Sequence, residues 1–199
     1  DCLIVWAMNG EALRAEQGYP VRLVVPGWEG NMWVKWIRRL EFGDKPYMTR
    51  EETSKYTDLL SNGKARMFTW VMEAKSVVTS PSPEKPILQK GVHQIRGLAW
   101  SGRGKIKRVD VSIDGGKNWK TSKLHGPVFS KSLSRFTFPL NWNGEELLIQ
   151  SRAIDETGYV QPHIHELQKV RGLNSIYHNN SIATWLVNKN GKVENVRLG

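Results

Sequence analysis

Alternation of apolar and polar side chains is clearest in the C-terminal two thirds of the chain. Residues 109–113 and 136–140 each place an apolar side chain at every second position, which is the period of a half-buried β-strand. Turn-forming residues separate such runs, at Ser101–Gly104, Asp114–Gly116, Asn141–Gly144 and Asn188–Gly191. Short strands at this spacing, with no helical pattern between them, predict a β-sandwich of immunoglobulin type.

The N-terminal residues have a mixed pattern that predicts short strands, turns and one amphipathic stretch. An apolar side chain at every third position from Val34 to Leu40 predicts one helical turn leading into a strand. Further on, Thr49 and Glu52 have the spacing of a capping box at the start of a helix; otherwise residues 48–58 form a loop. The chain is therefore expected to be mainly β, with an α+β part before the sandwich.

Composition places the chain among globular proteins. It has 199 residues, of which 39% are hydrophobic, and no apolar run approaches the length needed to span a membrane. Cys2 is the only cysteine, which excludes an internal disulfide and a metal site built from several cysteines.

The chain is strongly basic, with a formal net charge of +10. Such a field attracts an anionic substrate, an acidic protein or a nucleic acid. Binding of nucleic acid rests on charge alone, because no zinc motif, RNP-type strand or recognition helix accompanies it. We expect no nucleic-acid partner.

Three local motifs have structural readings. Ser112–Trp119 fits the Asp-box pattern Ser-x-Asp-x-Gly-x-x-Trp, in which the carboxylate braces a hairpin turn. A single copy does not make a propeller. Gly102–Lys105 is too short for a phosphate-binding loop and reads as a hairpin turn. His163 and His165 would share one face of a strand, but no third metal ligand lies near them in the sequence, so a solvated loop edge is favoured.

The stretch from Gly18 to Lys35 is the best candidate for a ligand site. A Gly-Tyr-Pro turn leads into an apolar strand, and Pro26 and Gly27 end that strand. Glycines let backbone N–H groups face outward, and the cations Arg22 and Lys35 flank the turns, so the segment suits an anion such as a phosphate. The alternative is a buried strand followed by a solvated surface turn.

The segment resembles the pterin-binding stretch of the sulfite oxidase family of molybdenum enzymes, above all the molybdenum subunit of the Sox sulfite or sulfane dehydrogenases. Further matching segments follow in the order of that family, at Arg50–Asp58, Ala99–Lys105, Ser151–Pro162 and Arg171–Asn180. The resemblance covers almost the whole chain. It implies that these residues form only the C-terminal half of such a protein.

By this resemblance, five residues contact a molybdopterin cofactor: Gln17, Arg22, Trp33, Val34 and Lys35. Gln17 stands where sulfite oxidases have a histidine. This difference and Trp33 favour the sulfane dehydrogenase branch.

The same resemblance assigns two catalytic residues. Tyr56 matches the active-site tyrosine, whose phenol assists proton movement. Arg171 matches an arginine that the C-terminal part sends back to the site to orient an anionic substrate. His178 is expected at an interface or beside the site.

The resemblance implies two domains. Residues 1–64 would end the molybdopterin-binding domain, and residues 65–199 would form the immunoglobulin-like dimerisation domain, with the Asp155 region supporting the contact between subunits. Cys2 does not lie in the motif of the metal-ligating cysteine, which is expected in the missing N-terminal half. The chain alone is therefore expected to be inactive and to hold no metal.

The implied activity is that of a sulfite or sulfane dehydrogenase with a molybdenum-molybdopterin cofactor. It would oxidise sulfite, or sulfane sulfur on a carrier protein, and pass electrons to a c-type cytochrome. A homodimer and a periplasmic location are further implications. The alternative from another functional class is a non-catalytic β-sandwich that dimerises or binds an anionic partner.

Overall fold

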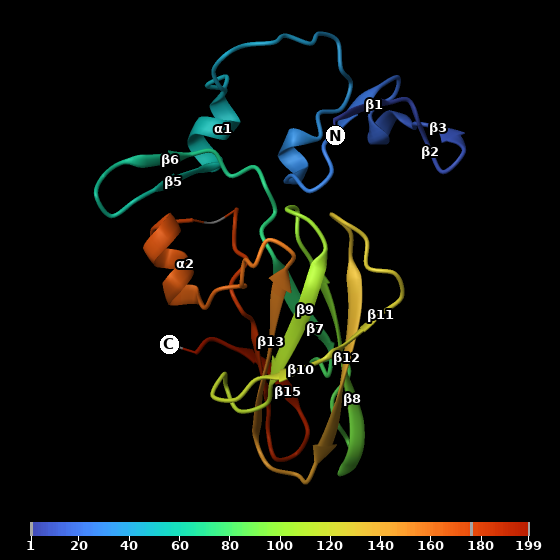
Figure 1. Cartoon of the computed structure of the whole chain (residues 1–199), viewed down its shortest axis with the longest axis vertical. Coiled ribbons are helices and arrows are strands. Elements are labelled where there is room, and N and C mark those ends of the chain that lie inside the picture. Colours follow the sequence, from blue (N-terminus) through green and yellow to red (C-terminus); the bar gives the residue numbers. More distant parts are fainter. Residues whose placement is uncertain (1, 176, 199) are drawn as a thin grey trace. The chain divides into compact units, whose positions relative to one another are not determined.

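The computed structural model describes residues 2–175 and 177–198 of the chain (Figure 1). These residues form two compact units, one of residues 1–72 and 171–178 and the other of residues 73–170 and 179–199. The chain thus leaves the first unit once, enters it again for eight residues and then returns to the second.

The second unit is a sandwich of two antiparallel sheets (Figure 1). One sheet has the strand order β10-β9-β13-β14-β15 and the other the order β11-β12-β8-β7. Their bounds are β7 (Lys75–Ser80), β8 (Gly91–Trp100), β9 (Ile106–Ser112), β10 (Lys120–Thr121), β11 (Lys123–His125), β12 (Ser134–Trp142), β13 (Leu147–Asp155), β14 (Thr184–Val187) and β15 (Val193–Val196). The predicted mainly β fold with an immunoglobulin-like sandwich is confirmed.

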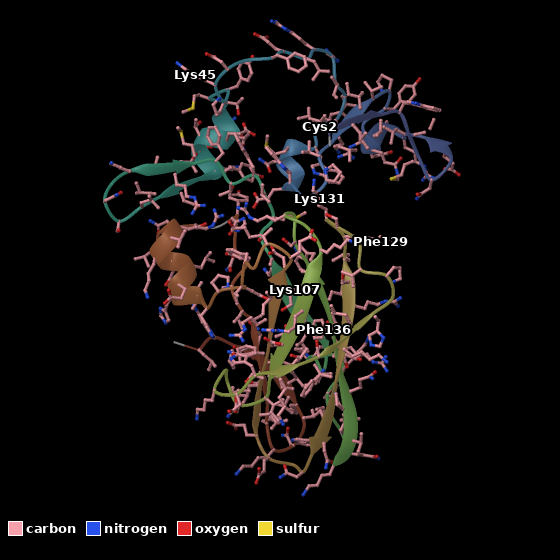
Figure 2. The ribbon with its side chains drawn as sticks, in the orientation of Figure 1. Cys2, Lys45, Lys107, Phe129, Lys131 and Phe136 are labelled. Carbon is pink, nitrogen blue, oxygen red and sulfur yellow. The ribbon has the colours of Figure 1, made fainter. Side chains whose placement is uncertain are left out.

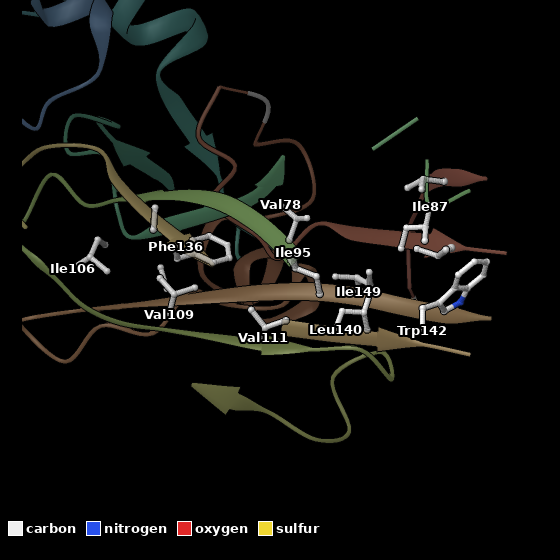
Figure 3. Packing of buried hydrophobic residues seen from close by; sticks show 14 of the residues in the cluster. Val78, Ile87, Ile95, Ile106, Val109, Val111, Phe136, Leu140, Trp142 and Ile149 are labelled. Atoms are coloured by element: carbon white, nitrogen blue, oxygen red, sulfur yellow. The ribbon is translucent and has the colours of Figure 1, made fainter. Parts of the chain in front are cut away.

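The core of the sandwich lies between the sheets (Figure 3). Alternation in β12 turns Phe136 and Leu140 inward, with only 1% and 2% of their surfaces exposed. By contrast, Phe129 on the loop before β12 is 62% exposed (Figure 2). In β9 the polar residues Asp110 and Ser112 are buried as well as the apolar ones, because Asp110 accepts hydrogen bonds from Arg108, Arg152 and Thr121.

The predicted Asp-box turn has the expected bracing contacts. Ser112 Oγ donates to an oxygen of Asp114 at 2.7 Å, and the backbone N–H of Asn118 donates to the same oxygen at 3.0 Å. These hydrogen bonds lower the pKa of the Asp114 carboxyl well below its usual range. The motif is a structural brace of the turn after β9.

Asp155 is fully buried in the second unit. Its carboxylate accepts hydrogen bonds from Ser101 Oγ at 2.8 Å and from Thr157 Oγ1 at 2.6 Å. The side chain therefore braces the end of β13 from inside, and any support that it gives to a subunit contact is indirect.

Two expectations for the sandwich are wrong. Residues 101–104 do not close a hairpin, because they join β8 to β9 and these strands belong to different sheets. The expectation that no helix lies between the strands is also wrong, because the helix α2 (Ile164–Arg171) lies between β13 and β14. It begins at Ile164 and the N–H of Leu167 donates to the carbonyl of His163, so His163 and His165 do not share the face of a strand.

The first unit has short strands and helices: β1 (Leu3–Val5), β2 (Ala7–Met8), β3 (Glu11–Ala12), η1 (Ala15–Gln17), β4 (Arg22–Val24), η2 (Gly30–Met32), α1 (Arg50–Lys55), β5 (Thr57–Leu59) and β6 (Ala65–Met67). Pairs of strands, β1 with β4, β2 with β3 and β5 with β6, form three small antiparallel sheets. Among the described residues, no helix is long and apolar enough to cross a membrane.

The helical turn predicted for residues 34–40 is absent. The Val34 carbonyl accepts from Leu23 N at 2.8 Å, and Ile37 N donates to the Val21 carbonyl at 3.1 Å. These backbone groups pair with the chain around β4, which leaves them no partner within a helix. The helix at Arg50 does form after Thr49, but the Thr49 side chain makes no capping hydrogen bond.

The predicted domains of 1–64 and 65–199 differ in extent from the two compact units, which also place residues 171–178 with the N-terminal part. The domain assignment stays a prediction, since compactness alone does not define the boundaries of a family.

Candidate functional site

The site region of the first unit is built on the turn around Gly18. Gly18 ends η1 with a φ of +109°, and a Cβ atom there would lie 2.9 Å from the Cβ of Lys35. Only glycine fits this conformation and this close approach without strain. The turn therefore brings the start of the Gly18–Lys35 segment directly beside its end.

Arg22 connects the two ends of this segment from β4. Its Nη1 donates to the Gln17 carbonyl at 3.0 Å and its Nη2 donates to the Trp33 carbonyl at 3.1 Å. The guanidinium carbon lies 5.9 Å from the centre of the Trp33 ring. The side chain that was predicted to contact the cofactor thus also fixes the backbone of two other predicted residues.

Lys35 closes the other side of the turn. Its Nζ donates to the Glu16 carbonyl at 2.8 Å and lies 4.6 Å from the centre of the Trp36 ring. The Val34 side chain is about half exposed, at 51%, while its carbonyl pairs with β4. The Gln17 side chain accepts a hydrogen bond from Arg14 N at 2.9 Å. The five predicted cofactor-binding residues therefore gather around one turn.

The donors of this turn fit an anionic group. An ammonium has three N–H donors and a guanidinium five, and the hydrogen bonds described above use one from Lys35 and two from Arg22. Arg22 Nε is buried with no acceptor among the residues that the structure describes. Cationic donors on a fixed backbone suit the phosphate of a pterin cofactor.

Tyr56 follows α1 and its ring lies beside that of Tyr177, with 5.0 Å between the centroids. Burial raises the pKa of the Tyr56 phenol, and Tyr177, Glu29, Glu52 and Glu51 raise it further. The phenol therefore stays protonated at neutral pH and is available as a hydrogen-bond donor.

Arg171 is buried in the first unit with 4% of its side chain exposed. Its Nη1 donates to Asp58 Oδ2 at 2.9 Å, and the Asp58 side chain is 5% exposed. Gly172 allows this approach, because a Cβ atom at that position would lie 2.1 Å from the Leu59 carbonyl oxygen. The arginine from the C-terminal part of the chain is thus held against Asp58, which follows Tyr56 by two positions in the sequence.

His178 forms a second buried contact of the returning segment 171–178. Its Nδ1 lies 2.7 Å from Glu29 Oε1, with side-chain exposures of 4% and 13%. His178 was expected at an interface or beside the site, whereas Glu29, Asp58 and Tyr177 were missed. Asp58 had a usable signal, since it ends the segment Arg50–Asp58 that carried the resemblance, two positions after Tyr56. Glu29 had none.

Aromatic rings fix the loop that carries Glu29. Trp28 stacks on Trp70 with 5.2 Å between ring centroids, and Phe68 lies 5.8 Å from Trp70. The Trp33 indole N–H donates to the Trp28 carbonyl at 3.1 Å. The loop is therefore held from both sides in the first unit.

No group of three His, Cys, Asp or Glu side chains in the described part of the chain could hold a metal ion. Cys2 is exposed. The described residues therefore bring the five predicted cofactor-binding residues to one turn, pair Arg171 with Asp58 and place Tyr56 beside Tyr177.

Two family models match the chain. Residues 66–185 match the Mo-co oxidoreductase dimerisation domain, and residues 1–51 match the oxidoreductase molybdopterin binding domain. The first match alone covers more than half of the chain.

Known proteins of this kind are similar to the chain. It is 33% identical over 181 residues to sulfite oxidase of Gallus gallus, covering 81% of the chain and 38% of that protein. Nitrate reductase [NADH] 2 of Nicotiana tabacum is 30% identical over 194 residues, covering 81% of the chain and 21% of that protein.

A solved structure is similar over the whole chain. It is the sulfane dehydrogenase SoxCD from Paracoccus pantotrophus, with 60% sequence identity, a TM-score of 0.93 and coverage of 100% of this chain and 51% of that one. The chain thus spans about half of its structural relative and about two fifths of the chicken sulfite oxidase. The matches confirm the resemblance: the chain belongs to the sulfite oxidase family of molybdopterin oxidoreductases, and is similar to Sox sulfane dehydrogenase.

Proposed function

We propose that the chain is part of a molybdenum-dependent dehydrogenase that oxidises sulfite or sulfane sulfur and passes electrons to a c-type cytochrome. The observation that carries this proposal is the Arg171–Asp58 pair, because it holds the predicted substrate-orienting arginine against Asp58, which follows Tyr56 by two positions in the sequence. The 60% identity to a sulfane dehydrogenase supports sulfane sulfur on a carrier protein as the substrate.

Arg22, Trp33, Val34, Lys35 and Gln17 would hold the molybdopterin. The guanidinium and ammonium would bind its phosphate, and the fixed backbone around Gly18 would set its position. When bound, the cofactor supplies a two-electron acceptor for the oxidation of sulfur. The metal-ligating cysteine would come from the N-terminal half of the family's fold.

Arg171 would bind and orient the anionic sulfur group. The Asp58 carboxylate, 2.9 Å away, limits the movement of the guanidinium, so that less ordering is needed when the substrate binds.

Tyr56 would hold a proton at its phenolic oxygen beside the substrate. For each two-electron step, one oxygen atom from water is added to sulfur, and two protons and two electrons leave. Because the pKa of this phenol is raised, Tyr56 would act as a hydrogen-bond donor rather than as a phenolate base.

The sandwich would pair two subunits as a homodimer, as its match to the dimerisation domain supports. The formal charge of +10 would favour docking of an acidic carrier or cytochrome. The family resemblance supports a periplasmic location.

The first test is the molybdenum content of the protein purified from its native source, measured together with its intact mass. About one molybdenum per polypeptide is expected, and dithionite-reduced and oxidised samples should differ in their molybdenum spectra. Protein without molybdenum and without pterin after purification by a mild procedure would refute the proposal and favour a non-catalytic binding module.

A further inference from the structure

Glu29 lies on a loop whose backbone position does not depend on its side chain. Its N–H donates to the Trp70 carbonyl at 2.6 Å, and Met72 N donates to the Gly27 carbonyl at 2.9 Å. The Trp28–Trp70 stack lies beside these bonds. The carboxylate of Glu29 is therefore presented from a fixed support.

His178 contacts this carboxylate in a buried environment. The Nδ1 to Oε1 distance of 2.7 Å is that of a charge-assisted hydrogen bond, and neither side chain is more than 13% exposed. Removing such a pair from water is costly unless the geometry is good. A buried pair linking residues 149 positions apart fixes where the returning segment 171–178 lies on the Trp28–Trp33 loop.

Tyr177 couples the position of His178 to the surroundings of Tyr56. It precedes His178 directly, and its ring lies 5.0 Å from the Tyr56 ring at an angle of 43°. A shift of His178 would move the Tyr177 ring and change the surroundings of the Tyr56 phenol.

We propose that Glu29 and His178 are a positioning pair, which sets the place of Tyr177 against Tyr56 and so tunes the phenol used in turnover. This inference rests on the proposed function, because it assigns Tyr56 a role there. Arg171 has its own support in Asp58, so the pair acts on Tyr56 rather than on the binding of substrate.

The effect of the pair on Tyr56 can be observed without turnover. Glu29 is one of the charges that raise the pKa of the phenol. Neutralising Glu29 is expected to lower the pKa of the Tyr56 phenol. Breaking the contact between His178 and Glu29 is expected to change this pKa by moving Tyr177.

The experiment compares Glu29→Gln, His178→Gln and the double variant in the complete, cofactor-loaded protein, with Glu41→Gln as the matched control. Glu41 pairs with Arg39 on the surface, with 53% and 79% of their side chains exposed. Tyrosine labelled with ¹³C at Cζ reports the titration of each phenol, and Tyr56→Phe assigns the Tyr56 signal.

The expected result is a lower Tyr56 pKa in Glu29→Gln and a displaced Tyr56 signal in His178→Gln. Both variants should lose about tenfold or more in kcat, with a smaller change in KM and unchanged molybdenum content. The double variant should lose no more than the worse single one, because the two side chains act as a unit.

An unchanged Tyr56 titration and an unchanged kcat in both single variants, as in Glu41→Gln, would overturn the proposal. If Glu29→Gln does not fold, His178→Gln tests the same proposal. A Tyr56 signal in His178→Gln identical to that of the wild type then refutes the positioning role of Glu29 and His178. Wild-type protein without molybdenum would refute the proposed function, whereas the tyrosine titration would still test the pair.

Discussion

Breaking the buried Arg171–Asp58 pair gives the sharpest test of how the site is held. The two charged atoms are 2.9 Å apart and the side chains are 4% and 5% exposed. At an effective dielectric constant of about 20, the attraction at this distance is about 6 kcal/mol. The cost of removing both groups from water offsets much of it, and deleting one partner of a buried pair typically costs about 3 to 5 kcal/mol.

We therefore expect Asp58→Asn and Arg171→Gln each to destabilise the first unit by about 3 kcal/mol or more. The double variant Asp58→Leu/Arg171→Met should be much closer to the wild type, because apolar groups of similar volume often replace a buried ion pair at little cost.

Amide hydrogen exchange of residues 57–67, which include β5 and β6, measures the loss of stability at the Arg171–Asp58 pair. The Leu60 amide donates to the Lys64 carbonyl at 2.9 Å in the turn between these strands, so its protection reports opening of the hairpin. A loss of about 3 to 5 kcal/mol accelerates exchange roughly 10²- to 4 × 10³-fold. The control is again Glu41→Gln in an exposed pair, which should change stability by less than about 1 kcal/mol.

A change in the opening free energy of less than about 1 kcal/mol in the single variants, or a loss in the double variant equal to the sum of the two, would show that the pair does not support the first unit. In the loaded enzyme, Asp58→Asn should also raise KM for the anionic substrate. Asp58 would act on KM through Arg171, which would lose its orientation, and not through its own contact with the substrate. An unchanged KM would remove Asp58 from the support of the site.

Two further predictions concern single side chains. Tyr56→Phe should lower kcat by roughly 10²-fold or more with a smaller effect on KM, since removal of a proton-handling group acts on the transition state; steady-state kinetics with an unchanged kcat would make Tyr56 a packing residue. Asp114→Asn should lower the melting temperature at pH 7, whereas the same change at the exposed Asp44 should not. Because the pKa of Asp114 is lowered in the folded chain, its stabilisation is present above its unfolded pKa of about 4 and fades as the pH falls below that value. A melting-temperature difference that does not shrink toward pH 2 would contradict the Asp-box assignment.

Much of the fold was available from the sequence. Alternation in β12 gave the inward face of that strand, because a strand turns successive side chains to opposite sides, whereas β9 buries Asp110 and Ser112 as well as its apolar residues. The turn at Gly18 and the flanking cations indicated an anion site from local chemistry alone. The helical turn predicted for residues 34–40 was wrong, because the same three-residue spacing of apolar side chains occurs there in an extended chain whose backbone pairs with the chain around β4.

The tertiary structure alone decided how the site residues are supported. The Arg171–Asp58 and His178–Glu29 pairs join residues 113 and 149 positions apart. In the sequence these charged residues have the composition of a solvated surface, and nothing in their spacing selects one partner over another. Only the path of the chain, which returns residues 171–178 to the first unit, removes them from water. The cost of burying a charged or polar group then requires each of them to meet a partner.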